Sequence, residues 1–191
     1  MSLNATLGFS TTNLAISSAI RRVMGNSPVS HAWIAFNNPE PLFIRYVLQA
    51  ETTGIQQIPW NQWLTKGNIL KAEFDLDGPE LDIKWAIEKF VGLPYDWQSA
   101  GLAGCWRWLG RWLQSNGQSP KRLMCSEFVL RVLQHANYDS VAHFNPEVTN
   151  PLRLLERVLE MSLKFHEQFA IKMLHNDLIP LAAKAMITVE K

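Results

Sequence analysis

Two neighbouring stretches, His31-Ala-Trp-Ile-Ala-Phe36 and residues 42–50 (LFIRYVLQA), decide the fold of this chain. The first is short, apolar and aromatic. The second places Arg45 and Gln49 on one side and Ile44 and Leu48 on the other, which is the period of a strand. The Asn-Asn-Pro run between the two stretches indicates a turn. Together they predict an antiparallel pair of strands.

In the rest of the chain the apolar spacing predicts two more strands and then, after residue 76, mainly helices. Residues 54–58 and 68–76 predict two more strands. Helices are expected over about 14–23, 81–91, 101–113 and 126–137, with a long amphipathic helix over about 151–175 and a weaker helical segment near 178–190. Because strands come first and helices follow, this order favours an α+β domain over a doubly wound sheet.

Length and composition restrict the class of protein. A chain of 191 residues fits one domain, and 47% hydrophobic with 18% charged residues can bury a substantial core. Disorder, collagen and coiled coil are therefore excluded. The formal net charge of +1 gives no global attraction to nucleic acid, so we expect no nucleic-acid partner.

Cysteine usage and the start of the sequence bear on the cellular compartment. Two cysteines cannot form a multi-bridge framework, and the first thirty residues lack the pattern of a signal peptide. No apolar run reaches the roughly 18 residues that a membrane-spanning helix needs. We therefore expect a cytoplasmic protein without a transmembrane helix, and the sequence leaves its oligomeric state open.

Cys125 precedes apolar residues at helical spacing, so we expect it at the start of a helix. A thiol there feels unpaired backbone N–H groups and the positive end of the helix dipole, which lower its pKa. The same N–H groups can hold an oxyanion. The alternative is a small core residue, since Cys125 precedes Phe128 by three positions and can share its face.

His31 begins the first predicted strand directly after a turn and shares a face with Trp33. A strand end can hold an imidazole rigidly against a neighbouring helix start, where it can act as a base. Glu51 closes the next strand on the side of Gln49 and could orient the second ring nitrogen of His31. The alternatives are an ordinary core or surface histidine and a solvated carboxylate.

Considered together, these residues give the chain a resemblance to a known family. It resembles the circularly permuted papain-like hydrolases of the NlpC superfamily, in the branch of YiiX-like proteins and lecithin retinol acyltransferase. In this branch the histidine precedes the cysteine. The resemblance rests on four blocks in matching order: Ser30-His31-Ala-Trp-Ile-Ala-Phe36, Leu48-Gln-Ala-Glu51 with Gly54-Ile55, Phe90-Val-Gly-Leu-Pro-Tyr-Asp-Trp97, and Met124-Cys-Ser-Glu-Phe-Val129.

The resemblance implies a fold and a set of site residues. The fold would be a permuted papain-like domain spanning 1–191, with a small antiparallel sheet packed against helices. Its core would cover about 28–155, and a helical extension would cover about 156–191. Cys125 would be the nucleophile, His31 the general base and later acid, and Glu51 the residue that orients His31. Tyr95 would lie beside the nucleophile; its alternative role is packing between neighbouring residues.

The implied activity is a cysteine hydrolase or acyltransferase that forms an acyl-enzyme on an amide, ester or thioester. Its substrates would be peptides, cell-wall peptides or lipid acyl groups. Neither a metal nor a cofactor is needed, and the other histidines lack metal-ligand spacing. The second hypothesis is a non-catalytic binding or structural protein, such as a phage or effector component, with the same fold.

The predicted 101–113 helix is rich in tryptophan and arginine. Trp108, Arg107 and Arg111 belong to a stretch between Trp97 and Glu127 that contains no acidic residue. This pattern suits a helix that lines the substrate approach and makes a peripheral contact with a membrane. An ordinary surface helix that packs its apolar face on the core has the same pattern.

Overall fold

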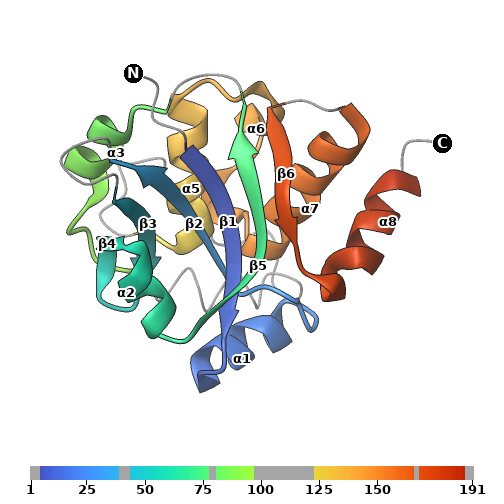
Figure 1. The fold of residues 1–191 in the computed structure, drawn as a ribbon, viewed down its shortest axis with the longest axis horizontal. Coiled ribbons are helices and arrows are strands. Elements are labelled where there is room, and N and C mark those ends of the chain that lie inside the picture. The colour runs from blue at the N-terminus through green and yellow to red at the C-terminus, as the bar shows by residue number, and fades with distance from the viewer. Residues whose placement is uncertain (1–4, 39–43, 78–80, 97–122, 166–167, 188–191) are drawn as a thin grey trace.

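The computed structural model describes residues 5–38, 44–77, 81–96, 123–165 and 168–187. Within these ranges an antiparallel sheet in the order β4-β3-β2-β1-β5-β6 forms the centre of the molecule (Figure 1). Its strands are β1 (Ala5–Thr12), β2 (His31–Asn37), β3 (Arg45–Glu51), β4 (Gly54–Pro59), β5 (Asn68–Leu76) and β6 (Phe169–Leu174).

Helices accompany this sheet along the whole described chain, which confirms the α+β class and the antiparallel sheet. The described helices are α1 (Ala15–Val23), α2 (Trp60–Thr65), α3 (Ile83–Phe90), α5 (Cys125–His135), α6 (Asp139–Ala142), α7 (Pro151–Glu160) and α8 (Ile179–Ile187), with 3-10 turns η1 (Pro146–Val148) and η3 (Asn176–Leu178). The predicted strands at 54–58 and 68–76 and the predicted helices at 14–23, 81–91 and 126–137 are present.

The two faces of the sheet carry different cores. On one face Phe9, Ile34 and Phe74 pack with residues of α5 and α7 such as Phe128 and Leu155, and both helices lie behind the sheet in Figure 1. On the other face α2 covers a smaller cluster around Trp33 and Trp63, whose rings lie 5.0 Å apart. The candidate site lies at the start of β2 and the neighbouring end of β3.

Strand β1 is a structural element that the sequence analysis did not predict, because residues 1–30 were expected to hold only a helix and a turn. It lies between β2 and β5, outside the expected 28–155 core. Residues 5–11 are all buried. Its residues alternate, since Ala5, Leu7 and Phe9 belong to the main core and Thr6, Gly8 and Ser10 lie between them, so the two-residue period of a strand was present in the sequence but was overlooked. Position 8 of this strand requires glycine, because a Cβ there would lie 2.0 Å from the ring of Trp33.

The prediction of one long helix over 151–175 is wrong beyond residue 165. Helix α7 runs from Pro151, with Asn150 as its N-cap, to Glu160, and a π-helical segment follows it over Met161–Phe165. The chain then forms β6, which pairs antiparallel with β5. The C-terminal extension is therefore part strand and not only helical. Strand β6 supplies hydrogen-bond partners for the backbone groups at the edge of β5. The apolar spacing along the sequence does not show that this edge needs a partner.

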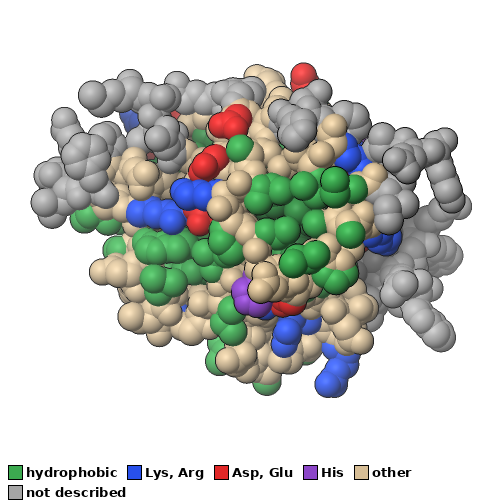
Figure 2. All heavy atoms as spheres, turned by 45° about the vertical axis from the view of Figure 1, so that its right-hand side comes forward, with side chains coloured by type: hydrophobic (Ala, Val, Ile, Leu, Met, Phe, Trp, Pro, Cys, Tyr) green, Lys and Arg blue, Asp and Glu red, His purple; other side chains and the backbone are tan. Residues whose placement is uncertain are grey.

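The side of the molecule that carries β6 and α8 exposes apolar side chains among charged ones (Figure 2). The exposed residues include Ile171 of β6 and Ile179 and Met186 of α8. None of the helices described is both long enough and apolar enough to cross a membrane.

Candidate active site

Cys125 is the first residue of α5, as predicted, and its helix start has no side-chain cap. The first backbone N–H groups of a helix lack intrahelical partners, so a thiolate can accept from them. The Cys125 sulfur interacts with the backbone of Ser126 in this first turn and with the backbone of Ala32 in β2. The Ser126 hydroxyl donates to the Thr149 carbonyl at 2.6 Å, which fixes the start of α5 against the turn before α7.

His31 opens β2 and is the second sequence-predicted residue that the fold brings to this point. Its ring is hydrogen bonded to the Cys125 side chain, although 94 positions separate the two residues in the sequence (125 − 31). Helix α5 packs along β2 and β3, so its first residue meets the first residue of β2. The expected contact between the helix start and the strand start is therefore present.

The pKa values of this pair move in opposite directions. Burial by itself raises the pKa of Cys125, but the hydrogen bond and charge of His31, together with hydrogen bonds to the backbone of Ala32 and Ser126, lower it more, so the net pKa lies below the ordinary thiol value. Burial by itself lowers the pKa of His31, but the hydrogen bond and charge of Cys125, together with the Gln49 hydrogen bond and the Glu51 charge, outweigh it, so the net pKa is raised. Mutual stabilisation of a thiolate and an imidazolium contributes to both directions.

Gln49, rather than Glu51, contacts His31 directly. The His31 Nε2 atom lies 3.0 Å from Gln49 Oε1. The Gln49 amide in turn donates to Glu51 Oε1, and Lys66 Nζ lies 2.9 Å from Glu51 Oε2. The carboxylate is therefore held by Gln49 and Lys66, and it reaches His31 only through the Gln49 amide and through its charge. Glu51 was expected to contact His31 directly, but Gln49 lies between them and makes that contact instead.

Trp63 of α2 determines which ring nitrogen of His31 carries the permanent proton. The Trp63 indole N–H donates to Gln49 Oε1 at 3.0 Å, and an indole N–H can only donate. The Gln49 atom that faces His31 is therefore an oxygen, so His31 Nε2 must be protonated to bind it. The remaining nitrogen, Nδ1, is left to exchange a proton with the Cys125 thiol. Sequence analysis missed both Gln49 and Trp63.

A signal for Gln49 was nevertheless available in the sequence. It is an amide between the apolar residues Leu48 and Ala50, on the same side of the strand as Val47 and Glu51, and the structure shows that it is fully buried. Buried polar side chains are almost always hydrogen bonded, so such a residue indicates a polar partner across the sheet. Trp63 offered no comparable signal, because α2 has only six residues and its pattern predicts no element.

Tyr95 also reaches the site, as expected. Its hydroxyl is hydrogen bonded to the Cys125 side chain, and burial, followed by the charge of Cys125, raises its pKa well above the ordinary value. Tyr95 pairs with Leu123 just before α5. On the other side, Leu93 accepts from Ile55 N at 2.8 Å. Gly54 permits this approach, because its φ is +119° and a Cβ there would lie 2.5 Å from the Leu93 oxygen.

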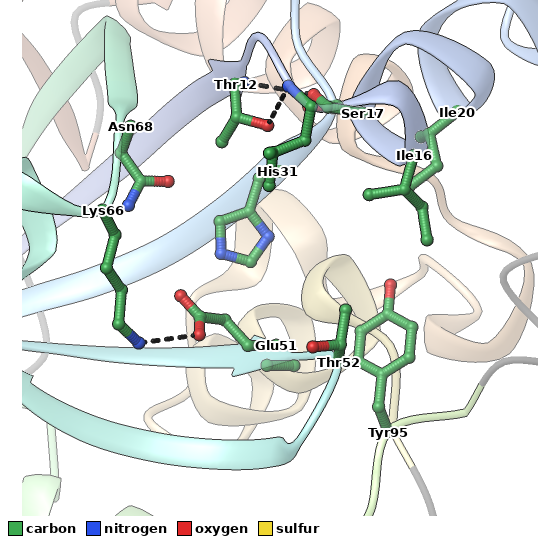
Figure 3. Close-up of a pocket in the computed structure, with 13 residues that line it drawn as sticks. Thr12, Ile16, Ser17, Ile20, His31, Glu51, Thr52, Lys66, Asn68 and Tyr95 are labelled. Carbon is green, nitrogen blue, oxygen red and sulfur yellow. Dashed lines mark hydrogen bonds and ion pairs between the residues drawn. The ribbon is translucent and has the colours of Figure 1, made fainter.

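A pocket of about 320 Å³ opens above His31 (Figure 3). His31 points into it, and Tyr95 lies at its lower edge. Glu51 and Lys66 form part of one wall, and helix α1 forms the opposite wall. Cys125 is buried, and it contacts both His31 and Tyr95, which line the pocket. The arrangement combines a thiol, an imidazole and a ligand-sized cavity.

Trp108, Arg107 and Arg111, which were predicted to line the substrate approach, lie outside the described residues. Among the residues that are described, no group of three or more His, Cys, Asp or Glu side chains is arranged to hold a metal ion. In comparisons with protein-family models and with curated protein sequences, nothing matches this chain.

Replacing Trp63 by Phe is expected to remove one of the two bonds that orient the Gln49 amide, leaving only its donation to Glu51, and so to mix the two neutral tautomers of His31. Loss of one neutral hydrogen bond of about 0.5–1.5 kcal/mol lowers the Cys125 alkylation rate at pH 6 by roughly 3- to 10-fold. Nitrogen-15 NMR of the His31 ring, recorded at a pH above the raised pKa of His31 where the ring is neutral, measures the tautomer directly. Trp60→Phe is the matched control, because Trp60 stacks on Trp63 at 4.9 Å in the same helix but makes no described bond to Gln49. An unchanged tautomer in the Trp63→Phe variant would contradict the argument.

Proposed function

We propose that this protein is a cysteine-dependent acyl hydrolase or acyltransferase. One observation carries the proposal: Cys125, at an uncapped helix start, shares a hydrogen bond with His31, and their pKa values are shifted in opposite directions. Strongly perturbed titratable groups that face each other beside a cavity are the mark of a nucleophile and its base. The bonds in question are the amides, esters or thioesters of peptides, cell-wall peptides or lipids.

The chemistry divides into two steps. In the first, the Cys125 thiolate attacks the acyl carbonyl carbon, and the carbonyl π electrons move to oxygen. The tetrahedral oxyanion collapses, the bond to the leaving group breaks, and His31 gives its Nδ1 proton to that group. In the second step, His31 takes a proton from water or from an acceptor alcohol, which attacks the acyl-enzyme and releases the Cys125 thiolate.

Two donors are available for the oxyanion. The backbone N–H of Cys125 belongs to the first turn of α5, where no side chain caps the helix. The Tyr95 hydroxyl is the second, because its raised pKa keeps it protonated beside the sulfur. Gln49 holds the Nε2 side of His31 throughout, so only the Nδ1 proton moves.

The proposed family is the circularly permuted papain-like hydrolases of the NlpC superfamily. Supporting it, a histidine at a strand start precedes, in the chain, the cysteine helix that packs on the same sheet. A polar side chain from the next strand holds the histidine, and an aromatic hydroxyl lies beside the sulfur. The four sequence blocks of the resemblance thus supply the residues that meet at the site.

The test is selective alkylation of the native protein. With limiting iodoacetamide at pH 6, Cys125 is expected to react at least about tenfold faster than Cys105, because only a thiol with a lowered pKa is substantially ionised at that pH. Peptide mass spectrometry gives both rates in one sample, and the urea-unfolded protein is the control in which the rates converge. Equal rates in the native protein would remove the catalytic proposal and favour a binding role for the fold.

A further inference from the structure

Helix α1 exposes apolar residues and buries a polar one, which is the reverse of an ordinary surface helix. Its apolar residues recur at helical spacing, yet Leu14 just before it and Ile16 and Val23 within it are 60%, 39% and 47% exposed. The one buried residue of the helix is Ser17. A surface helix normally turns its apolar stripe toward the core, so this stripe has another use.

Hydroxyl groups hold α1 in this orientation. The Ser17 hydroxyl bonds to the Ser30 hydroxyl, to Thr11 Oγ1 at 3.0 Å and to the backbone N–H of Thr12 at 3.1 Å. Ser30 directly precedes His31, so the same cluster that anchors α1 also fixes it relative to the base. The outward direction of the apolar stripe is therefore a specified feature of the fold.

Part of this stripe is a wall of the pocket above His31. Leu14, Ile16 and Ile20 line the pocket, and Figure 3 shows Ile16 and Ile20 facing His31 across it. The opposite wall is polar, with Asn68 and the ion pair of Lys66 and Glu51. An aliphatic group that enters the pocket therefore finds its largest apolar surface on α1, with Ala50 and the ring of Tyr95 adding to it.

We propose that the wall formed by Leu14, Ile16 and Ile20 seats the linear aliphatic chain of an acyl substrate whose carbonyl carbon lies at Cys125. This inference rests on the proposed function and names its substrate class. From residue 14 to residue 20 the wall extends about 9 Å along the helix axis, at 1.5 Å per residue. That length exceeds the reach of a single aliphatic amino-acid side chain, so it favours a linear chain over a peptide residue.

The test compares alkylating agents of increasing chain length on Cys125. The thiolate displaces iodide from iodoacetamide and from N-hexyl- and N-octyl-iodoacetamide by the same reaction, so only the chain differs. Each methylene buried against α1 strengthens binding by about three- to fourfold. At concentrations below saturation, we expect the N-octyl reagent to react at least about tenfold faster than iodoacetamide.

Substitutions on α1 separate the wall from the rest of the helix. Ile16→Asp and Ile20→Asp are expected to abolish the chain-length preference, measured as the ratio of the N-octyl rate to the iodoacetamide rate in the same variant. Val23→Asp is the matched control, because Val23 is an exposed apolar residue of the same helix that does not line the pocket. It should keep the preference. Circular dichroism establishes that all three variants fold.

The outcomes distinguish this inference from the proposed function. Rapid labelling of Cys125 without chain-length preference would overturn the acyl wall and leave the hydrolase proposal standing. If N-iodoacetyl-leucinamide reacts as fast as the N-octyl reagent, a peptide side chain and not a linear chain occupies the wall. If Cys125 is unreactive with every reagent, the proposed function fails. Calorimetry with N-octylacetamide then tests the wall alone, and binding weakened by Ile16→Asp but not by Val23→Asp supports it.

Discussion

Cys125→Ser is expected to lower the hydrolysis of p-nitrophenyl octanoate by at least about 10³-fold, because the nucleophile and its base act as one unit. A serine hydroxyl has no anionic form near neutral pH, so the helix start and His31 have no thiolate to stabilise. The substitution removes no packing volume of consequence, so the thermal unfolding midpoint should change little. Cys105→Ser is the matched control and should retain activity.

His31→Ala is expected to cause a loss of similar size, and the double variant should be no worse than either single one. The exposed His143 at the end of α6 provides the control, because His143→Ala removes an imidazole that makes no contact with Cys125. If the Cys125→Ser variant kept most of the esterase activity, the residue would not be the nucleophile. The prediction would also fail if a variant lost ester hydrolysis only because it no longer folds.

The pH dependence of Cys125 alkylation is the second large expected effect. Because the pKa of Cys125 is lowered, its thiolate persists below the range in which an ordinary thiol ionises, and alkylation declines only as the pH falls through this lowered pKa. His31→Gln removes the hydrogen bond and the positive charge, so burial then dominates and the pKa of Cys125 rises. At pH 6 the alkylation rate of His31→Gln should be at least about tenfold below that of the wild type.

Turnover should fall on both sides of this range. The reaction needs the Cys125 thiolate, which is lost at low pH, and the His31 imidazolium, which is lost as the pH rises through the raised pKa of His31. A bell-shaped rate profile with its acid limb below the ordinary thiol range is therefore expected. Alkylation of the wild type that titrates like a free thiol would show that His31 does not stabilise the thiolate.

Local patterns were sufficient to predict where the two central residues lie in their own elements. The apolar helical period that follows Cys125 placed it at a helix start, and a turn followed by an apolar run placed His31 at a strand start. Both signals act over a few residues, because helix starts and strand starts are set by backbone groups and side-chain periodicity nearby. The α+β class followed from the same signals.

The partner of His31 depends on contacts that no local pattern contains. Residues 47, 49 and 51 lie on one side of β3, and the observed pairing of Trp33 with Gln49 would place Glu51 opposite His31 if continued. Lys66 holds the Glu51 carboxylate, and Trp63 orients Gln49 toward the ring, so the amide becomes the partner. Both of these residues come from α2 or the turn after it, which no sequence pattern predicted.

The sequence by itself determined the class of fold, the ends of most of the strands and helices that it predicted, and the places of Cys125 and His31 at the starts of their elements, because each of these depends on interactions between neighbours in the chain. Only the tertiary structure decided that β1 and β6 complete the sheet, that Gln49 holds His31, and that α1 turns Ile16 and Ile20 into the pocket. These features depend on which distant groups satisfy a strand edge, an amide or a buried hydroxyl, and the hydrophobic period along the chain carries no record of such partners.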